Sequence, residues 1–400
     1  MRPNANMPTG TTLAALQDRL AGWVSPLRTL RTLRATARDT VRGPGLRRAG
    51  GAAALASAAL LAPYAPPAAA QPSWEPTQAV EFVVPAGTGG GADLMARFIA
   101  EAITKNRLMK QPIEVVNRAG QSGGEGLLYM RQERGNPHRL VITLSSLFTS
   151  PLGLGLPFNW RDLTPVQMLA QDQFVLWVPA NAPHQTPQAF FDAVRKAPPG
   201  TFKLGGTGSK QEDQILSVML ETALATRLTY VPMRGGGDVA QALSAGQIDV
   251  SVNNPIEAAS LWREGKVRPL CVFDGARLPY PDKVAGSLAW QDLPTCMSFG
   301  VPVQYLMMRG VFMAGGATPA QVAYYQRVLD RVRALPEWRT LMQQGAFKDT
   351  TMDGPPFVSW LDRTESFHRV LMREARLTPG SMVTLTGSSG PAAAASAPRK

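Results

Sequence analysis

The stretch Val83-Val84-Pro85-Ala86-Gly87-Thr88-Gly89-Gly90-Gly91-Ala92-Asp93 constrains the fold more than any other part of the sequence. It predicts a buried strand that stops at a proline, a turn through glycines and then a helix, because Leu94, Phe98 and Ile99 recur at helical spacing. The first turn of a helix has backbone N–H groups without partners, at the positive end of the helix dipole. Glycines let a ligand approach those groups closely. The pattern is typical of an anion-binding turn.

Short apolar runs alternate with amphipathic stretches from Val80 onward. The first half predicts strands at 80–84, 113–116 and 140–144, with helices beginning at 93 and 125. This strand-helix-strand order favours a mostly parallel sheet with helices on both faces.

The second half repeats the pattern. A strand at 174–178 is expected to cross into a second domain, and the run 301–313 is expected to return the chain to the first domain. The other expected strands are 202–204, 228–231, 248–252 and 267–273, and the expected helices are 186–196, 239–245, 318–335, 338–344 and 356–376. Asn254 and Pro255 suit the N-cap and first position of one more helix.

The N-terminal region has the features of an export signal. Arg47-Arg48 precede an apolar, alanine-rich run over 49–62, and Ala68-Ala69-Ala70 offers a cleavage site near Ala70-Gln71. The run is too short for a transmembrane helix, so we expect a secreted or periplasmic protein. The Sec and Tat routes both stay open, and we hypothesise a true start near Val41. The segment 387–400 has low complexity and is expected to be disordered.

The formal net charge of +12 does not predict nucleic-acid binding. Residues 1–70 hold nine arginines and two aspartates, so +7 of this charge lies in the segment assigned to export and its extension. The remainder is mildly basic and lacks a Lys/Arg block, which argues against a nucleic-acid partner.

The two cysteines leave two interpretations open. Cys271 and Cys296 could pair in an oxidising compartment. Cys271 also lies in the apolar run 269–273, where a buried free thiol is common, and this second interpretation is the favoured one.

Catalytic and cofactor motifs are few. The glycine turn fits the G-x-G-x-x-A pattern of dinucleotide sites, but Asn117-Arg118 stand where the ribose-binding acid should be, and Glu114 lies inside the strand. The three histidines His138, His184 and His368 are far apart and lack metal-ligand spacing. We therefore expect no cofactor and no metal, and catalysis is not the favoured interpretation.

A second turn, Gly205-Gly206-Thr207-Gly208-Ser209, also follows a strand and opens a helix. If the two domains face each other, both turns present helix N-termini to the cleft, where a small carboxylate would fit. Alternatives stay open at each turn. Ser209 with Glu212 matches a capping box, and Asp93 could meet a ligand or only compensate its own helix dipole.

An ordered set of motifs then resembles the solute-binding proteins of tripartite tricarboxylate transporters, the Bug family. The set covers about residues 78–376, and no single motif decides it. Its members are Val83-Val84-Pro85, Gly89-Gly90 with Asp93 and Ala96-Arg97, Val116-Asn117-Arg118 with Gly120 and Gly123, Leu163-Thr164-Pro165, Gly208-Ser209, Tyr230-Val231-Pro232 with Gly235-Gly236, Gly246-Gln247-Ile248-Asp249, Gly265 to Leu270, Pro294-Thr295, and Gly315 with Pro319. Two departures, Ala119 in place of a usual proline and the segment 136–140, put the identity of the ligand in doubt more than the family.

The resemblance implies an α/β two-domain periplasmic binding protein, a Venus flytrap of type II-like form, in which each domain is a mostly parallel sheet flanked by helices. It places domain 1 at 76–174, domain 2 at 175–300 and a return segment of domain 1, with a helical C-terminus, at 301–378, after the extension and signal peptide at 1–70. Carried onto matching positions, the ligand-binding residues are Ala86, Thr88, Gly89, Gly90, Asp93, Ser145, Ser146, Thr207, Gly208, Ser209, Asp213 and Asn253.

The function expected from these features is capture of a small carboxylate by a monomer that serves membrane transporter subunits or a sensor. Two other classes stay open. A secreted hydrolase or isomerase could use Asp93 or Asp213 as general acid or base. A structural envelope protein would leave the cleft empty and would respond to no ligand.

Overall fold

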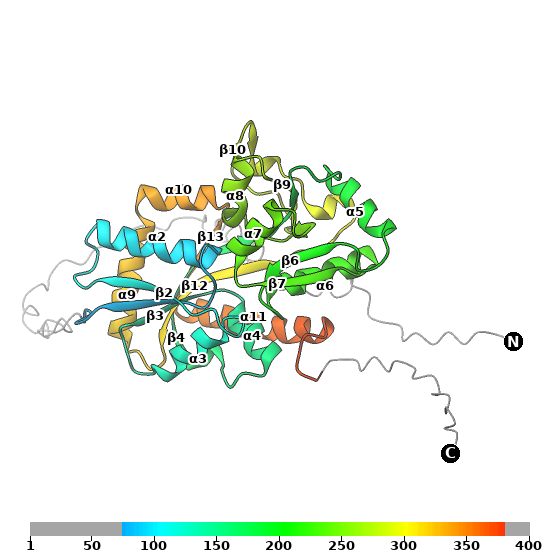
Figure 1. Cartoon of the computed structure of the whole chain (residues 1–400). Helices are drawn as coiled ribbons and strands as arrows, with labels where there is room; N and C mark the ends of the chain where they lie inside the picture. The colour runs from blue at the N-terminus through cyan, green and yellow to red at the C-terminus, as the bar shows by residue number, and fades with distance from the viewer. Residues whose placement is uncertain (1–73, 381–400) are drawn as a thin grey trace, which may run out of the picture. The chain divides into compact units, whose positions relative to one another are not determined.

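Two sheets with flanking helices form the described part of the chain, residues 74–380 of a computed structural model (Figure 1). The expected export signal, N-terminal extension and low-complexity tail lie outside these residues. Within residues 74–380, no helix combines the length and the apolar character that crossing a membrane requires.

The first sheet has six strands in the order β13-β4-β12-β3-β1-β2. The strands are β1 (Val80–Val84), β2 (Ile113–Asn117), β3 (Arg139–Thr143), β4 (Leu163–Gln173), β12 (Leu306–Ala314) and β13 (Lys348–Met352). Strand β1 pairs in parallel with β2 and β3, whereas β12 runs antiparallel to β3 and β4, and β13 antiparallel to β4.

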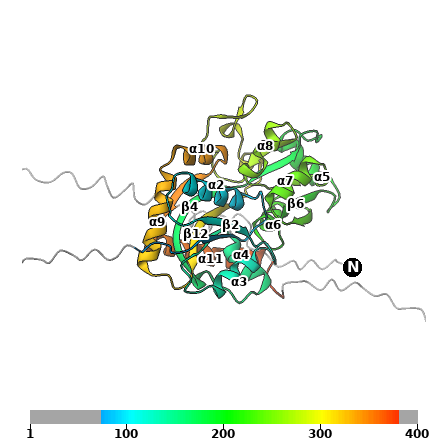
Figure 2. The same ribbon diagram turned by 60° about the vertical axis from the view of Figure 1, so that its left-hand side comes forward.

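Five helices pack against this sheet. They are α2 (Gly91–Lys105), α3 (Gly124–Gln132), α4 (Ser146–Leu154), α9 (Pro319–Arg333) and α11 (Gly354–Glu374). Helices α2 and α9 contact each other on one face, and α3, α4 and α11 lie on the other (Figures 1 and 2). Buried side chains of β1, β3, β12 and α11, such as Val83, Val141, Phe312 and Phe357, form a core on the latter face.

The second sheet has five strands in the order β7-β6-β8-β5-β9. Its strands are β5 (Val175–Pro179), β6 (Lys203–Thr207), β7 (Thr229–Met233), β8 (Val250–Ser251) and β9 (Val267–Val272), and its helices are α5 (Pro187–Lys196), α6 (Glu212–Leu224), α7 (Gly236–Ser244) and α8 (Pro255–Arg263). Trp177, Trp262 and Trp290 pack together in its core, with ring centroids 5.0 to 6.2 Å apart.

The return segment contacts both halves of the fold. Its helix α10 (Pro336–Gln344) contacts α8 of the second sheet and α9 of the first. In addition, Trp290 Nε1 donates to Gln344 O at 3.2 Å, and Tyr280 Oη donates to Phe347 O. The remaining small elements are the hairpin of β10 (Lys283–Ala285) with β11 (Leu288–Ala289) and the 3-10 turns Trp160–Asp162, Trp290–Asp292 and Cys296–Phe299. The predicted domain boundaries stay a prediction.

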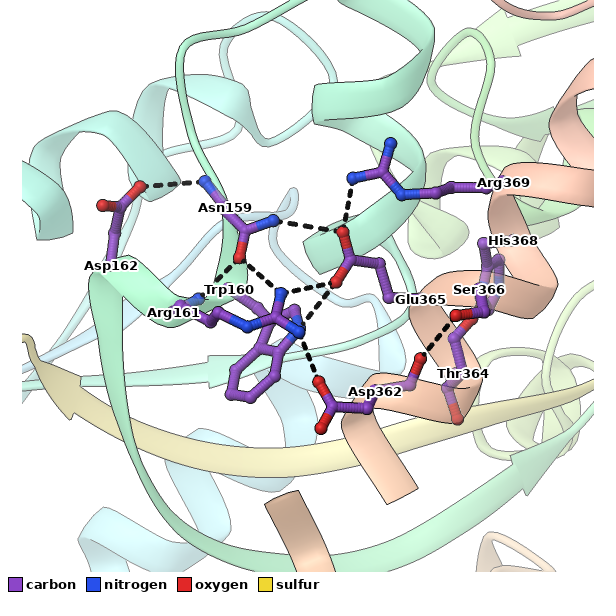
Figure 3. A network of polar contacts seen from close by, with 10 residues as sticks. All are labelled: Asn159, Trp160, Arg161, Asp162, Asp362, Thr364, Glu365, Ser366, His368 and Arg369. Atoms are coloured by element: carbon purple, nitrogen blue, oxygen red, sulfur yellow. Dashed lines mark hydrogen bonds and ion pairs between the residues drawn. The ribbon is translucent and has the colours of Figure 1, made fainter. Parts of the chain in front are cut away.

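Two carboxylates of helix α11, Glu365 and Asp362, tie it to the turn Trp160–Asp162 (Figure 3). Glu365 accepts from Asn159 Nδ2 at 3.1 Å, from Trp160 Nε1 at 3.0 Å, from Arg161 at 2.7 Å and from Arg369 at 2.5 Å. Burial alone would raise the pKa of Glu365, but the hydrogen bonds from Arg161, Arg369 and Trp160 hold it below its ordinary value.

The α/β two-sheet fold agrees with the sequence prediction, with corrections of detail. The sheets are mixed, because strands next to the crossings between them, such as β12 and β5, pair antiparallel with their neighbours. Strands β4 and β13 and helix α4 were not predicted. The favoured free-thiol interpretation is wrong, since Cys271 and Cys296 are bonded, with an S–S distance of 2.02 Å.

Candidate functional site

A cavity of about 300 Å³ lies between elements of the two sheets. Its volume is at the lower end of the range for small-molecule sites. It is lined by Pro85, Ala86, Gly90, Gly91, Ala92, Ala119, Ser122, Gly123, Leu144, Thr207, Gly208, Ser209, Gln211, Glu212, Asp213, Pro232, Met233, Arg234, Gly236, Asn254, Glu257, Met307 and Arg309. Both glycine turns that the sequence singled out therefore contribute to one cavity.

Asp93 holds the first glycine turn in place. Its side chain is 1% exposed and accepts from the N–H of Gly89 at 2.9 Å, from Arg97 Nε at 3.0 Å and from Asn117 Nδ2 at 2.9 Å. The carboxylate is thus fully engaged inside the turn, and Asp93 does not line the cavity. Of the two interpretations left open, the geometry favours a positioning role.

The first turn faces a third glycine run, Gly235–Gly237, at the start of α7. A Cβ at Gly87 would lie 2.8 Å from the carbonyl oxygen of Arg234, and a Cβ at Gly235 would lie 3.1 Å from the Cα of Gly87. Only glycine allows this approach of two backbones. Gly235 and Gly236 entered the sequence prediction only as part of the family motifs, without a place in the site.

Protein carboxylates already occupy the amide groups of the two predicted turns. The N–H of Gly91, at the start of α2, donates to Glu257 Oε1 at 2.9 Å. The N–H of Thr207 donates to Asp213 Oδ2 at 2.6 Å. Internal carboxylates therefore occupy an N–H at the N-terminus of α2 and another at the end of β6 in this conformation.

The predicted capping box at Ser209 does not form. Helix α6 begins at Glu212, and its N-cap residue, Gln211, makes no side-chain capping bond. Instead, the N–H of Ser209 donates to Ser122 Oγ at 3.1 Å, and Gln211 Nε2 donates to Ser122 O at 2.5 Å. This contact joins the second turn to the loop that follows β2.

Half of the predicted ligand-binding residues line the cavity. Those that do are Ala86, Gly90, Thr207, Gly208, Ser209 and Asp213, and those that do not are Thr88, Gly89, Asp93, Ser145, Ser146 and Asn253. Asn253 donates to Gly236 O at 2.8 Å and to Glu257 Oε2 at 3.0 Å, so it holds α7 and α8 together. Ser145 and Ser146 lie buried at the start of α4.

An arginine that the sequence analysis missed reaches the cavity from β12. Arg309 is 1% exposed and bonds to Asp172 Oδ2 through Nε at 3.1 Å and Nη2 at 2.5 Å. Its Nη2 also donates to Asn254 Oδ1 at 3.1 Å, while Nη1 makes no hydrogen bond within residues 74–380. A lone charge inside the apolar run 306–313 was the available signal, because a buried charge requires a partner.

Glu212 is the second missed residue with unused bonding capacity. It is 3% exposed, lines the cavity, and its Oε1 makes no hydrogen bond to any described residue. Burial raises the pKa of Glu212 to about 7, although its own N–H, the charge of Arg309 and the N–H of Ser146 act in the opposite direction. Burial likewise raises the pKa of Asp213 well above its ordinary value.

Comparison with known proteins identifies relatives along most of the chain. Residues 95–353 match the family described as "Tripartite tricarboxylate transporter family receptor". The UPF0065 protein in the gbd 5'region of Cupriavidus necator is 24% identical over 335 residues, which cover 83% of this chain and 97% of the relative. Protein BugT of Bordetella pertussis is 26% identical over 236 residues, covering 57% of this chain and 67% of BugT.

Solved structures show the same fold. MatC from Rhodopseudomonas palustris with bound malate superposes with a TM-score of 0.65 at 22% identity, covering 74% of this chain and 99% of MatC. An R. palustris protein with adipate gives a TM-score of 0.67 at 20% identity, covering 75% and 98%. The periplasmic binding protein BugD gives 0.67 at 19% identity, covering 76% and 99%.

Proposed function

This chain belongs to the tripartite tricarboxylate transporter receptor family, and we propose that it captures a small carboxylate in the cavity between its two sheets. The observation that carries the proposal is the meeting of Gly90, Gly208 and Arg309 in one cavity. Glycines without side chains leave room for a ligand between the two turns, and a guanidinium is the side chain best matched to a carboxylate.

Solved relatives support the ligand class. MatC is described with bound malate and another R. palustris protein with adipate, both of which are small carboxylates. For this chain, Arg309 Nη1 is a donor with no hydrogen-bond partner among the described residues, and Gly208 and Ser209 line the same cavity.

The proposed mechanism is non-covalent binding with hinge closure. Two crossings join the sheets, one between β4 and β5 and the other between β9 and β12. The close contacts of Gly87 with Arg234 and of Ser122 with Gln211 correspond to a closed form. Opening would break these contacts together with those of Gly91 with Glu257 and of Lys210 with Gly153, and it would leave each sheet intact, as in other binding proteins that close by hinge motion.

The same observations favour binding over catalysis. Asp93 is engaged within its own turn, and Asp213 accepts from Thr207 N–H, so both acids named for a hydrolase or isomerase already have local partners. We propose that the protein acts without chemical turnover. Incubation with a bound carboxylate should return it unchanged, and product formation would favour the enzymatic alternative.

The family consists of periplasmic solute-binding proteins, and we propose that this chain is exported to the same compartment. The disulfide between Cys271 and Cys296 supports an oxidising compartment. We further propose a monomer that delivers its ligand to membrane transporter subunits or to a sensor.

A thermal-shift screen of the purified protein against a panel of small carboxylates tests the proposed function. A ligand present at 1,000 times its dissociation constant should stabilise the protein by about 4 kcal/mol, which raises Tm by several degrees. Isothermal titration should then give a stoichiometry of one. A panel without any stabilising carboxylate would contradict the proposal.

A further inference from the structure

We infer that the solute of this cavity carries a protonated amine as well as a carboxylate, with Glu212 receiving the amine and Arg309 the carboxylate. This inference rests on the proposed function and specifies its ligand. It starts from two side chains of opposite charge that line the same cavity, are almost fully buried, and each keep one polar atom without a partner within residues 74–380.

The charges around the cavity disfavour a purely anionic ligand. Three lining carboxylates, Glu212, Asp213 and Glu257, form no ion pair with any described lysine or arginine, whereas Arg309 is already paired with Asp172. Arg234 also lines the cavity, but its side chain is 87% exposed and pairs with Asp238. A dicarboxylate would bring two further negative charges close to these acids and would require Glu212 and Asp213 to stay protonated, whereas an ammonium group favours the ionised form of Glu212.

The three acids are not equivalent. Glu257 accepts from the N–H groups of Gly91 and Asn254 and from Asn253 Nδ2, and Asp213 accepts from the N–H of Thr207. These hydrogen bonds stabilise the carboxylates within the protein. Glu212 Oε1 has no such partner, so it is the acid with free capacity to accept from a ligand. An ammonium group supplies both the donors and the missing positive charge.

Arginine and glutamate together define the ligand class. Arg309 Nη1 can donate to a ligand carboxylate while Nη2 and Nε remain hydrogen-bonded to Asp172, so ligand binding does not break the buried ion pair. A small amino acid or other amino carboxylate satisfies both unpartnered atoms at once. A dicarboxylate satisfies only Arg309, and a simple amine only Glu212.

Matched ligands test the inference on the intact chain. Butyrate, succinate and γ-aminobutyrate, with their analogues valerate, glutarate and δ-aminovalerate, differ only in the group at the far end. Titration calorimetry should show that the amino acids bind at least about tenfold more tightly than the dicarboxylates. The ammonium group gains a charged hydrogen bond to Glu212, whereas a second carboxylate is repelled by the acids that line the cavity. Equal or tighter binding of the dicarboxylates would overturn the inference and leave the proposed function standing. No binding by any of the six would overturn both.

The Glu212→Gln variant identifies the residue responsible. It keeps the shape and removes the charge, so the amino acids should lose at least about tenfold in affinity while the dicarboxylates keep or gain affinity. Glu221→Gln is the matched control, because Glu221 lies on the same helix and pairs with Arg227 away from the cavity. Unchanged amino acid affinity in Glu212→Gln would overturn the assignment. The ligand ranking in the unsubstituted chain tests the inference without relying on the folding of either variant.

Discussion

Two buried glutamates of this protein have opposite surroundings. Glu365 in α11 accepts four hydrogen bonds, from the side chains of Asn159, Trp160, Arg161 and Arg369 (Figure 3). Its pKa is lowered despite burial. Glu212 in α6 leaves one oxygen unpartnered, and its pKa is raised to about 7. A satisfied carboxylate holds two elements together, whereas an unsatisfied one beside a cavity remains available for a ligand.

The comparison predicts that truncating one side chain near the cavity lowers the free energy of unfolding most where that side chain is paired with a buried charge. Asp172→Ala would leave Arg309 buried with only Asn254 as a partner, so we expect a loss of about 4 kcal/mol in the free energy of unfolding, measured by urea denaturation. The double variant with leucine at positions 172 and 309 removes both charges, so it should recover most of the lost stability. If Asp172→Ala unfolds at the same urea concentration as the parent, the ion pair does not stabilise the fold.

The two glutamates should respond oppositely to pH. The pKa of Glu212 rises from 4.5 unfolded to about 7 folded, so its protonation stabilises the fold at low pH. This contribution of about 3 kcal/mol is lost as pH rises from about 4.5 through 7. Glu365 behaves in the reverse way, since its lowered pKa gives stability that is lost on acidification.

Urea denaturation of Glu212→Gln between pH 4 and pH 8 measures this difference. Asp213, Glu257 and Arg309 face Glu212 and are common to both proteins, so the difference between the two profiles reports Glu212. The variant should gain stability over the parent as pH rises. Parallel profiles would show that Glu212 has an ordinary environment.

Glu365→Ala should destabilise the protein by about 2 kcal/mol without changing ligand affinity. Removing the Glu365 carboxylate leaves Trp160 Nε1 and Asn159 Nδ2 without their acceptor. The ion pairs with Arg161 and Arg369 add little to the free energy of unfolding, because both arginines are about half exposed. Glu374→Ala, an exposed position on the same helix, is the control and should change stability by less than about 0.5 kcal/mol. A weaker ligand affinity in Glu365→Ala would remove the distinction between the two regions.

The sequence predicted most elements of the fold because their signals are local. The run Val80–Val84 and the glycine turn after it form as expected. Strand β4 was missed because Gln167, Gln171 and Gln173 interrupt its apolar pattern, and β13 because its residues Lys348–Met352 are mostly polar and lie at a sheet edge. Cysteine pairing was disfavoured, wrongly, since residues 25 positions apart give no local evidence of contact.

The site was predicted in part for the same reason. Gly90 and Gly208 belong to turns that can be recognised along the chain, and both line the cavity. Glu257 looks like an ordinary capping residue of α8, and its bond to the N–H of Gly91 joins positions 166 residues apart. Arg309 and Glu212 acquire their roles only from neighbours brought together by folding.

Binding to Gly90 variants tests the central claim most directly. Gly90 lines the cavity with a backbone conformation open to any residue, and a Cβ there would lie 3.4 Å from its nearest neighbour, so Gly90→Phe should fill the cavity without straining the turn. Titration with the best carboxylate from the screen should show one site in the parent and at least a hundredfold weaker binding in the variant, with Tm unchanged. Equal affinity in both proteins would place the ligand elsewhere and contradict the account.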